Sequence, residues 1–146
     1  QAVMDHYVNA TVIIKAAAVA DYCPSTTAAE KIKKDKKNIS LELKNNPDII
    51  AEVGKHKGNR ILVGFAMETQ NLLVNATEKL RKKNMDLIVA NNLREEGAGF
   101  RTDTNVITII DRDGKTEALG KMTKMEAADA ILDRVKKIMK KGNRKK

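Results

Sequence analysis

The pattern of apolar and polar residues predicts alternating strands and helices along most of the chain. Continuous apolar runs are typical of strands covered on both faces, whereas apolar residues three and four positions apart indicate helices. Residues 39–43 instead alternate apolar and polar, as in a half-exposed strand that is able to pair with another subunit. The predicted strands are 11–16, 39–43, 61–65 and 85–90. The predicted helices are 46–56, 70–84 and 123–142, and residues 1–8 are predicted to be the end of another helix.

Two local signals predict where helices begin. Asn46 is a helix cap, and Pro47 follows at the first helical position, where the missing N–H of proline costs nothing. Thr123 with Glu126 three residues later forms a capping box for the last helix, which Gly142 ends.

Turn signals divide the rest of the chain. Residues 22–27 contain Pro24 and several hydroxyl residues and are predicted to be a loop. Residues 111–114, Asp-Arg-Asp-Gly, join strands at 106–110 and 115–119 as a hairpin. Together the elements predict an α/β fold: a Rossmann-like, three-layer, mostly parallel sheet flanked by helices, with an added antiparallel hairpin. We expect one domain over residues 1–146, with a mobile lysine-rich flap at 31–38 and a frayed basic tail at 142–146.

Composition supports a soluble protein with one real core. The chain has 146 residues, of which 42% are hydrophobic, and none of its apolar runs approaches the roughly 18 residues of a membrane span. A single cysteine, Cys23, cannot form an internal disulfide, which together with the lack of a signal peptide favours the cytoplasm. We expect no membrane partner.

The net charge of +9 favours anionic partners of any kind. Proteins that stack nucleic-acid bases usually interleave aromatic with basic residues. This chain has only four aromatic residues, so nucleic acid is not the expected partner.

The first strand leads into residues suited to a nucleotide. Small alanines at 16–18 follow it, then the carboxylate of Asp21, then a lysine run beginning at Lys31. Ligands of open α/β sheets bind at the carboxyl ends of strands, and these parts are those needed to hold a nucleoside triphosphate. Each part by itself has an alternative interpretation. The alanines could serve only for packing, and the lysine run could be a solvated loop.

Two further positions are open to the same question. Phe65 ends a predicted strand, where an aromatic ring either walls a base pocket or fills the core. Lys79 and Lys83 are four residues apart and share a helix face, as phosphate ligands or as solvated side chains.

Five motifs in the same order resemble the phosphopantothenoylcysteine synthetase family, over about residues 10–105. The motifs are Ala17-Ala18-Val19-Ala20-Asp21-Tyr22, Glu30-Lys31-Ile32-Lys33-Lys34, Asn46-Pro47-Asp48-Ile49, Gly64-Phe65-Ala66-x-Glu68-Thr69 and Asp86-Leu87-Ile88-Val89-Ala90-Asn91. Residues 97–105 also resemble the family's Gly-Phe-x-x-Asp-x-Asn segment. The resemblance implies a ligase of coenzyme A biosynthesis that uses CTP to join 4'-phosphopantothenate and L-cysteine through an acyl-cytidylate.

The resemblance also implies a role for each matching residue. Lys31 is the implied catalytic residue, supported by Lys33 and Lys34, and Asp21 is implied to contact the ribose or Mg²⁺. Around the nucleotide, the implied ligands are the backbone of Lys15, Ala16 and Ala17 at the cytosine, Lys44, Asn45, Asn46 and Pro47 along it, Phe65 as a wall, and Lys79 and Lys83 at phosphate or base.

Members of the family have a preceding segment with two further strands that is not in these 146 residues, so we expect nucleotide binding and impaired ligation from this chain. The family implies a homodimer, with FMN only in a fused decarboxylase half that is not present here. Two other hypotheses stay open: a basic RNA- or polyanion-binding module, and an ATP-using ligase of the same fold.

Overall fold

The computed structural model describes residues 1–34, 38–68, 71–92 and 103–143. The chain divides into two compact units, which are considered separately: unit 1 comprises Gln1–Ala16 and Ile49–Lys146, and unit 2 comprises Ala17–Asp48. Unit 1 holds the core, and unit 2 is the segment that leaves it after the first strand and returns before the second helix.

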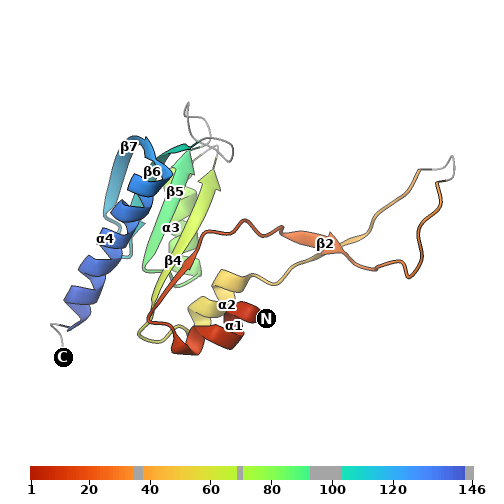
Figure 1. Cartoon of the computed structure of the whole chain (residues 1–146), viewed down its shortest axis with the longest axis horizontal. Coiled ribbons are helices and arrows are strands. Elements are labelled where there is room, and N and C mark those ends of the chain that lie inside the picture. The colour runs from red at the N-terminus through yellow and green to blue at the C-terminus, as the bar shows by residue number, and fades with distance from the viewer. Residues whose placement is uncertain (35–37, 69–70, 93–102, 144–146) are drawn as a thin grey trace. The chain divides into compact units, whose positions relative to one another are not determined.

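Unit 1 is a five-stranded mixed sheet between two layers of helix (Figure 1). The strand order is β1-β4-β5-β6-β7, with β1, β4 and β5 parallel, β6 antiparallel to β5 and β7 antiparallel to β6. The strands are β1 (Val12–Lys15), β4 (Ile61–Glu68), β5 (Leu87–Asn92), β6 (Thr104–Asp111) and β7 (Thr116–Thr123). The helices are α1 (Ala2–His6), the 3-10 helix η1 (Tyr7–Asn9), α2 (Ile49–His56), α3 (Leu72–Lys82) and α4 (Lys124–Asn143).

Each face of the sheet has its own hydrophobic core because side chains alternate along the strands. On one face, Leu62 and Ile88 of the strands pack against Ile50 of α2 and Leu80 of α3. The opposite face packs against α4. Its buried residues are Ile61, Val63, Leu87, Val89, Ile107 and Ile109 of the strands and Ala127, Ile131 and Val135 of α4.

Unit 2 contains a two-stranded antiparallel sheet formed by β2 (Tyr22–Pro24) and β3 (Leu43–Asn45). Its register pairs Tyr22 with Asn45 and Pro24 with Leu43. The Ser25 backbone N–H extends the pairing by donating to the Glu42 carbonyl at 2.9 Å.

The structure confirms the predicted fold class, with parallel strands in the middle of a three-layer arrangement and an antiparallel hairpin at one side. The capping box is also confirmed: the Thr123 N–H donates to Glu126 Oε2 at 2.8 Å, and the Glu126 N–H donates to Thr123 Oγ1 at 3.2 Å. The Thr123 backbone N–H and hydroxyl both donate to the Glu126 carboxylate, and these two bonds lower the pKa of Glu126.

Three local predictions were wrong. The segment 22–27 is not all loop, because Tyr22–Pro24 form β2, and the second strand of unit 2 begins at Leu43 rather than at residue 39. These two short strands pair across a long intervening segment, which no local pattern reveals. Asn46 does not precede the first helical residue, since α2 begins at Ile49. Its side-chain amide donates instead to the Ala20 carbonyl at 2.8 Å.

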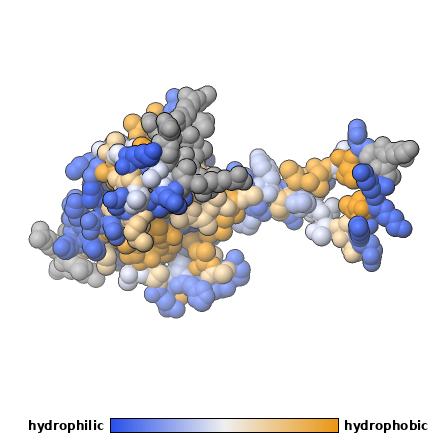
Figure 2. Space-filling model, turned by 45° about the horizontal axis from the view of Figure 1, so that its top comes forward, coloured by the Kyte–Doolittle hydropathy of each residue, from blue (hydrophilic) through white to orange (hydrophobic). Residues whose placement is uncertain are grey.

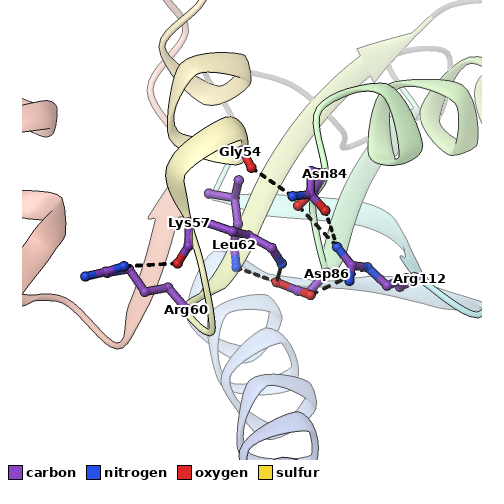
Figure 3. Close-up of polar contacts among 7 residues, drawn as sticks. All are labelled: Gly54, Lys57, Arg60, Leu62, Asn84, Asp86 and Arg112. Carbon is purple, nitrogen blue, oxygen red and sulfur yellow. Dashed lines mark hydrogen bonds and ion pairs between the residues drawn. The ribbon is translucent and has the colours of Figure 1, made fainter.

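A buried ion pair holds the amino ends of the central strands together (Figure 3). The Lys57 ammonium, 4% exposed, lies between α2 and β4 and donates to Asp86, which directly precedes β5. Asp86 also accepts the backbone N–H of Leu62 at 2.8 Å, and the Arg112 guanidinium lies 3.7 Å from its other oxygen. Burial lowers the pKa of Lys57, and the bond to Asp86 opposes that shift.

Replacement of Asp86 by alanine should destabilise unit 1 strongly, because it leaves the buried Lys57 ammonium without its partner. We expect the free energy of unfolding to fall by about 3–5 kcal/mol, measured by urea denaturation. Asp133→Ala is the matched control: this carboxylate is exposed, 3.5 Å from Lys136, and its loss should change the free energy by less than about 1 kcal/mol. Equal effects of the two substitutions would contradict a structural role for the buried pair.

Candidate functional site

An apolar surface is left uncovered on the α4 face of the sheet, toward the carboxyl ends of β1 and β4. Phe65 and Met67 continue the alternation of Ile61 and Val63, but each is 39% exposed whereas the earlier two are buried under α4. Ile14 on β1 is 41% exposed and is paired in register with Val63. We call Ile14, Phe65 and Met67 the apolar shelf.

Lys15 lies next to the shelf and ends β1. It is paired in register with Gly64, the residue before Phe65, so the sequence-predicted ligands Lys15 and Phe65 are on neighbouring strands. Ala16 follows immediately and is exposed. Unit 1 therefore brings the backbone of Lys15 and Ala16 close to that of Phe65, with Lys15 on the α2–α3 side of the sheet and Phe65 on the α4 side.

A buried carboxamide lies on β5, beside the shelf, and a half-buried one lies on β6, the next strand. Sequence reasoning assigned neither of them. Asn91 on β5 is only 9% exposed and is paired in register with Met67 of the shelf. Its Oδ1 atom, like that of Asn105 at the start of β6, is buried without a hydrogen-bond partner in the part of the chain that the structure describes. A buried acceptor left unpaired costs about 1–3 kcal/mol, so a partner supplied by a ligand would recover that energy.

The glycine of the Gly64-Phe65 motif has a packing role. A Cβ atom at Gly64 would collide with the Met85 sulfur and with Ile50 Cδ1, which lie on the face opposite the shelf. The glycine lets α2 and the residue before β5 approach the sheet closely. The motif thus combines a position that needs no side chain on one face with an exposed aromatic ring on the other.

Lys79 and Lys83 lie on the other side of the sheet from the shelf. Both belong to α3 or its last turn, and α3 packs on the face formed by Leu62 and Ile88. α3 runs from the carboxyl end of β4 to the amino end of β5, so Lys83 lies near the amino ends of the strands, with its backbone against Gly54 of α2. Within one copy, unit 1 does not place these two lysines on the face that carries Phe65.

The remaining predicted ligands lie in unit 2. The Asp21 carbonyl accepts the Asn46 N–H at 2.8 Å, and together with the bond from the Asn46 amide to Ala20 this holds the two returning strands at one end. Lys44 and Asn45 are part of β3, paired with Cys23 and Tyr22. The others, Ala17, Lys31, Lys33, Lys34 and Pro47, are in segments without helix or strand.

Several predictions fall on residues outside the described ranges. These are Lys36 and Lys37 of the lysine-rich flap, Thr69, residues 97–102 of the Gly-Phe-x-x-Asp-x-Asn segment and residues 144–146 of the tail. In the described ranges no group of three or more His, Cys, Asp or Glu side chains is arranged to hold a metal ion. No described helix is long and apolar enough to cross a membrane.

Comparison with known proteins identifies the family of the chain. Residues 1–139 match the family model described as the DNA/pantothenate metabolism flavoprotein C-terminal domain. The chain is 44% identical over 140 residues to the coenzyme A biosynthesis bifunctional protein CoaBC of Bacillus subtilis (strain 168), covering 96% of this chain and 34% of that protein. The chain thus spans about a third of the length of this relative.

Two solved structures have the same fold. The crystal structure of the C-terminal domain of a CoaBC protein superposes with a TM-score of 0.77 at 36% identity, covering 96% of this chain and 60% of that one. A structure described as Cab2 mutant H337A in complex with phosphopantothenate-cysteine superposes with a TM-score of 0.62, covering 87% of this chain and 45% of that one. Its 19% identity shows likeness of fold alone.

Fold and site together define a three-layer α/β domain of the Rossmann type, with an exposed apolar shelf toward the carboxyl ends of its parallel strands. The chain belongs to the family of DNA/pantothenate metabolism flavoprotein C-terminal domains.

Asn91→Leu should raise the stability of the chain without ligand, because it replaces a buried, unpaired acceptor by an apolar group of similar size. We expect a gain of about 1 kcal/mol in the free energy of unfolding, measured by urea denaturation. Asn84→Leu is the matched control: the Asn84 amide donates to the Gly54 carbonyl at 2.8 Å, and its oxygen accepts from Arg112. That variant should lose about 2 kcal/mol. A comparable loss at Asn91 would show that its carboxamide is already satisfied.

Proposed function

We propose that this chain is the nucleotide-binding part of a phosphopantothenate–cysteine ligase that uses CTP. The observation that carries the proposal is the apolar shelf, which lies next to the backbone of Lys15, toward the carboxyl ends of the parallel strands. The chain that carries it belongs to the family of DNA/pantothenate metabolism flavoprotein C-terminal domains. Carboxyl ends of parallel strands are where open α/β sheets bind ligands. A relative at 44% identity that is named for coenzyme A biosynthesis supports an activity in that pathway.

The proposed chemistry activates a carboxylate, which is a poor electrophile by itself. A carboxylate oxygen of phosphopantothenate attacks the α-phosphorus of CTP, and pyrophosphate leaves, giving an acyl-cytidylate. The amine of cysteine then attacks the acyl carbon, loses a proton and displaces CMP. The protein contributes positioning and neutralisation of the triphosphate rather than a covalent intermediate of its own.

In this proposal the base lies against Phe65, and the backbone of Lys15, Ala16 and Ala17 borders it. Asn91 provides an acceptor at the inner side of the shelf, next to Met67 in the sheet. The shelf supplies an apolar surface for a flat ring, and the carboxamide oxygen is able to accept a hydrogen bond from an amino group on it.

The phosphates are proposed to bind the lysines of unit 2, with Lys31 at the reacting α-phosphate and Lys33 and Lys34 beside it. Lys44, Asn45, Asn46 and Pro47 would border the nucleotide from the returning strand. Asp21 is proposed as the protein ligand of Mg²⁺, which suits that ion because Mg²⁺ is commonly held by one or two carboxylates together with substrate phosphates. When bound, Mg²⁺ would neutralise charge on the triphosphate.

Lys79 and Lys83 are proposed to bind phosphate or base, although they lie on the α3 face of their own copy. Their position favours a contribution to a nucleotide held by a second copy of the chain. The test is affinity for CTP. Lys79→Gln should weaken CTP binding when the chain is a dimer, and the same substitution in a monomeric variant should leave the CTP affinity of that variant unchanged.

CTP binding is the direct test of the proposed function. With Mg²⁺ present, CTP should bind this chain, and Lys31→Gln should weaken it by about tenfold or more, the effect expected when a charge-assisted phosphate contact is lost. Lys121→Gln, an exposed lysine of β7, is the control and should leave affinity unchanged. Isothermal titration calorimetry measures both, and circular dichroism confirms that each variant is folded.

The alternative functions give different results in the same titrations. Tighter binding of ATP than of CTP would assign an ATP-using ligase of this fold. Binding of single-stranded RNA that weakens steeply with salt, without any CTP binding, would assign a polyanion-binding module and overturn the proposal.

We also propose that the chain forms a homodimer through unit 2. Large apolar side chains there are 51–67% exposed, and hydrophobic surface recurs along this segment (Figure 2). These residues are Tyr22, Ile32, Ile39, Leu41 and Leu43. Exposed apolar surface concentrated in one segment is typical of an interface rather than of free surface.

Leu41→Lys should therefore convert a dimer into a monomer, because it places a charge in the proposed interface. Val74→Lys is the control, since Val74 on α3 is 68% exposed and lies outside unit 2. Sedimentation velocity measures the mass of each. A monomeric parent chain, or dissociation by both substitutions alike, would rule out unit 2 as the specific interface.

A further inference from the structure

A hollow lies in unit 1, at the amino ends of the parallel strands. It has a volume of about 730 Å³ and lies between the C-terminal half of α4 and the turn end of the β6–β7 hairpin. Its apolar lining comes from Leu87 at the start of β5, Ile109 on β6 and Ile138 on α4. Leu87 and Ile109 are almost fully buried, so the apolar lining is part of the core on the α4 face.

Cationic side chains from both elements border this hollow. Five of its lining residues are basic and two are acidic. The basic ones are Lys115 on the hairpin and Arg134, Lys137, Lys140 and Lys141 on α4, where the spacing of three and four residues places the last three on one side of the helix.

Both acidic residues of the hollow already have partners. Asp111 Oδ1 accepts the backbone N–H of Lys115 at 2.9 Å and so fixes the hairpin turn. The Glu117 carboxylate accepts two hydrogen bonds from Arg134, from Nε at 2.7 Å and from the second guanidinium nitrogen. The remaining positive charge, on the lysines, is in excess.

Lys115 and Lys137 line the same hollow, one from the hairpin and the other from α4. The Arg134 hydrogen bond is the main cause of a lowered pKa at Glu117, and the charges of Lys137 and Lys115 lower it further. Lysines near a helix C-terminus also stabilise the helix dipole, which explains Lys140 and Lys141. It does not explain Lys115, which approaches from the hairpin.

Position separates this hollow from the proposed CTP site. α4 begins at Lys124, after β7 has ended at the same end of the sheet as the carboxyl ends of β4 and β5, and returns toward the amino ends of these two strands. The hollow is therefore at the opposite edge of the sheet from the apolar shelf. A ligand here does not take part in the proposed ligation.

We propose that this hollow binds a small molecule that combines an apolar group with a phosphate or sulfonate. The apolar group lies against Ile138, above the almost fully buried Leu87 and Ile109, and the anion lies among Lys115, Lys137 and Lys140. The volume is in the range of pockets that hold drug-sized ligands, about 300–1,000 Å³. An apolar floor with a cationic border requires both parts of the ligand for tight binding.

The test uses 1-naphthyl phosphate as the probe, on the whole chain labelled with ¹⁵N. We expect saturable amide shift changes at Lys115, Thr116 and residues 137–141, and affinity at least about tenfold higher than for inorganic phosphate or for naphthol, a difference of about 1.4 kcal/mol. Shifts confined to residues around Phe65 would mean that the probe uses the shelf and would overturn the proposal.

Two charge-reversal pairs test the cationic half of the site. Lys137→Glu with Lys140→Glu should weaken the probe by about tenfold or more, as expected when attractive charges at the anion become repulsive. Lys121→Glu with Lys124→Glu changes the net charge equally at the other end of the sheet and should have no effect. Equal weakening by both pairs would reduce the site to general attraction by net charge.

Ile138→Trp tests the cavity independently of charge. Ile138 is half-buried on α4 and lines the hollow, so an indole there should occupy it and abolish probe binding, and circular dichroism checks that the chain stays folded. Unchanged affinity would overturn the proposal. So would binding of single-stranded RNA at these lysines without binding of naphthyl phosphate, since the surface would then serve a polyanion. CTP affinity should be unaltered in all these variants, so failure here leaves the proposed function standing.

Discussion

The ion pair between Lys57 and Asp86 is the constraint on which the arrangement of unit 1 depends. One carboxylate contacts the loop after α2, the backbone of β4 and the side chain of Arg112 beyond β6 (Figure 3). A buried pair of this kind adds little net stability compared with an apolar replacement, because removing both charges from water costs nearly what their attraction returns. The pair instead fixes the register, because Asp86 directly before β5 binds both Lys57 and the backbone N–H of Leu62 on β4.

Fixing the amino ends of the strands also determines what happens at their carboxyl ends. The register set near Asp86 places Phe65 beside Val89 and Met67 beside Asn91. A shift of one residue would turn the shelf toward α2 and α3 and bury Gly64 on the wrong face. Interactions remote from the shelf therefore decide which side chains it presents, and the two hydrophobic cores maintain that choice along the whole length of β4.

The sequence allowed most of unit 1 to be predicted because continuous apolar runs and cap residues are local signals. It could not give β2 and β3, each of three residues, because their pairing joins segments separated by almost twenty positions. The spacing of Lys79 and Lys83 indicated that they lie near each other along a helix. No local pattern could show that this helix packs on the face of the sheet opposite Phe65. Asn91 and Asn105 were overlooked because a polar residue near a strand end is ordinary. Their inward position becomes evident only once the register is known.

β1 is an edge strand of the five-stranded sheet, and among the described residues no other strand pairs with its outer side. Its four residues, Val-Ile-Ile-Lys, are mostly apolar and carry none of the prolines or bulges by which proteins commonly protect such a margin. The backbone amides and carbonyls along it are arranged to continue the ladder. A fourth parallel strand beside Val12–Lys15 would enlarge the sheet without altering any pairing already formed.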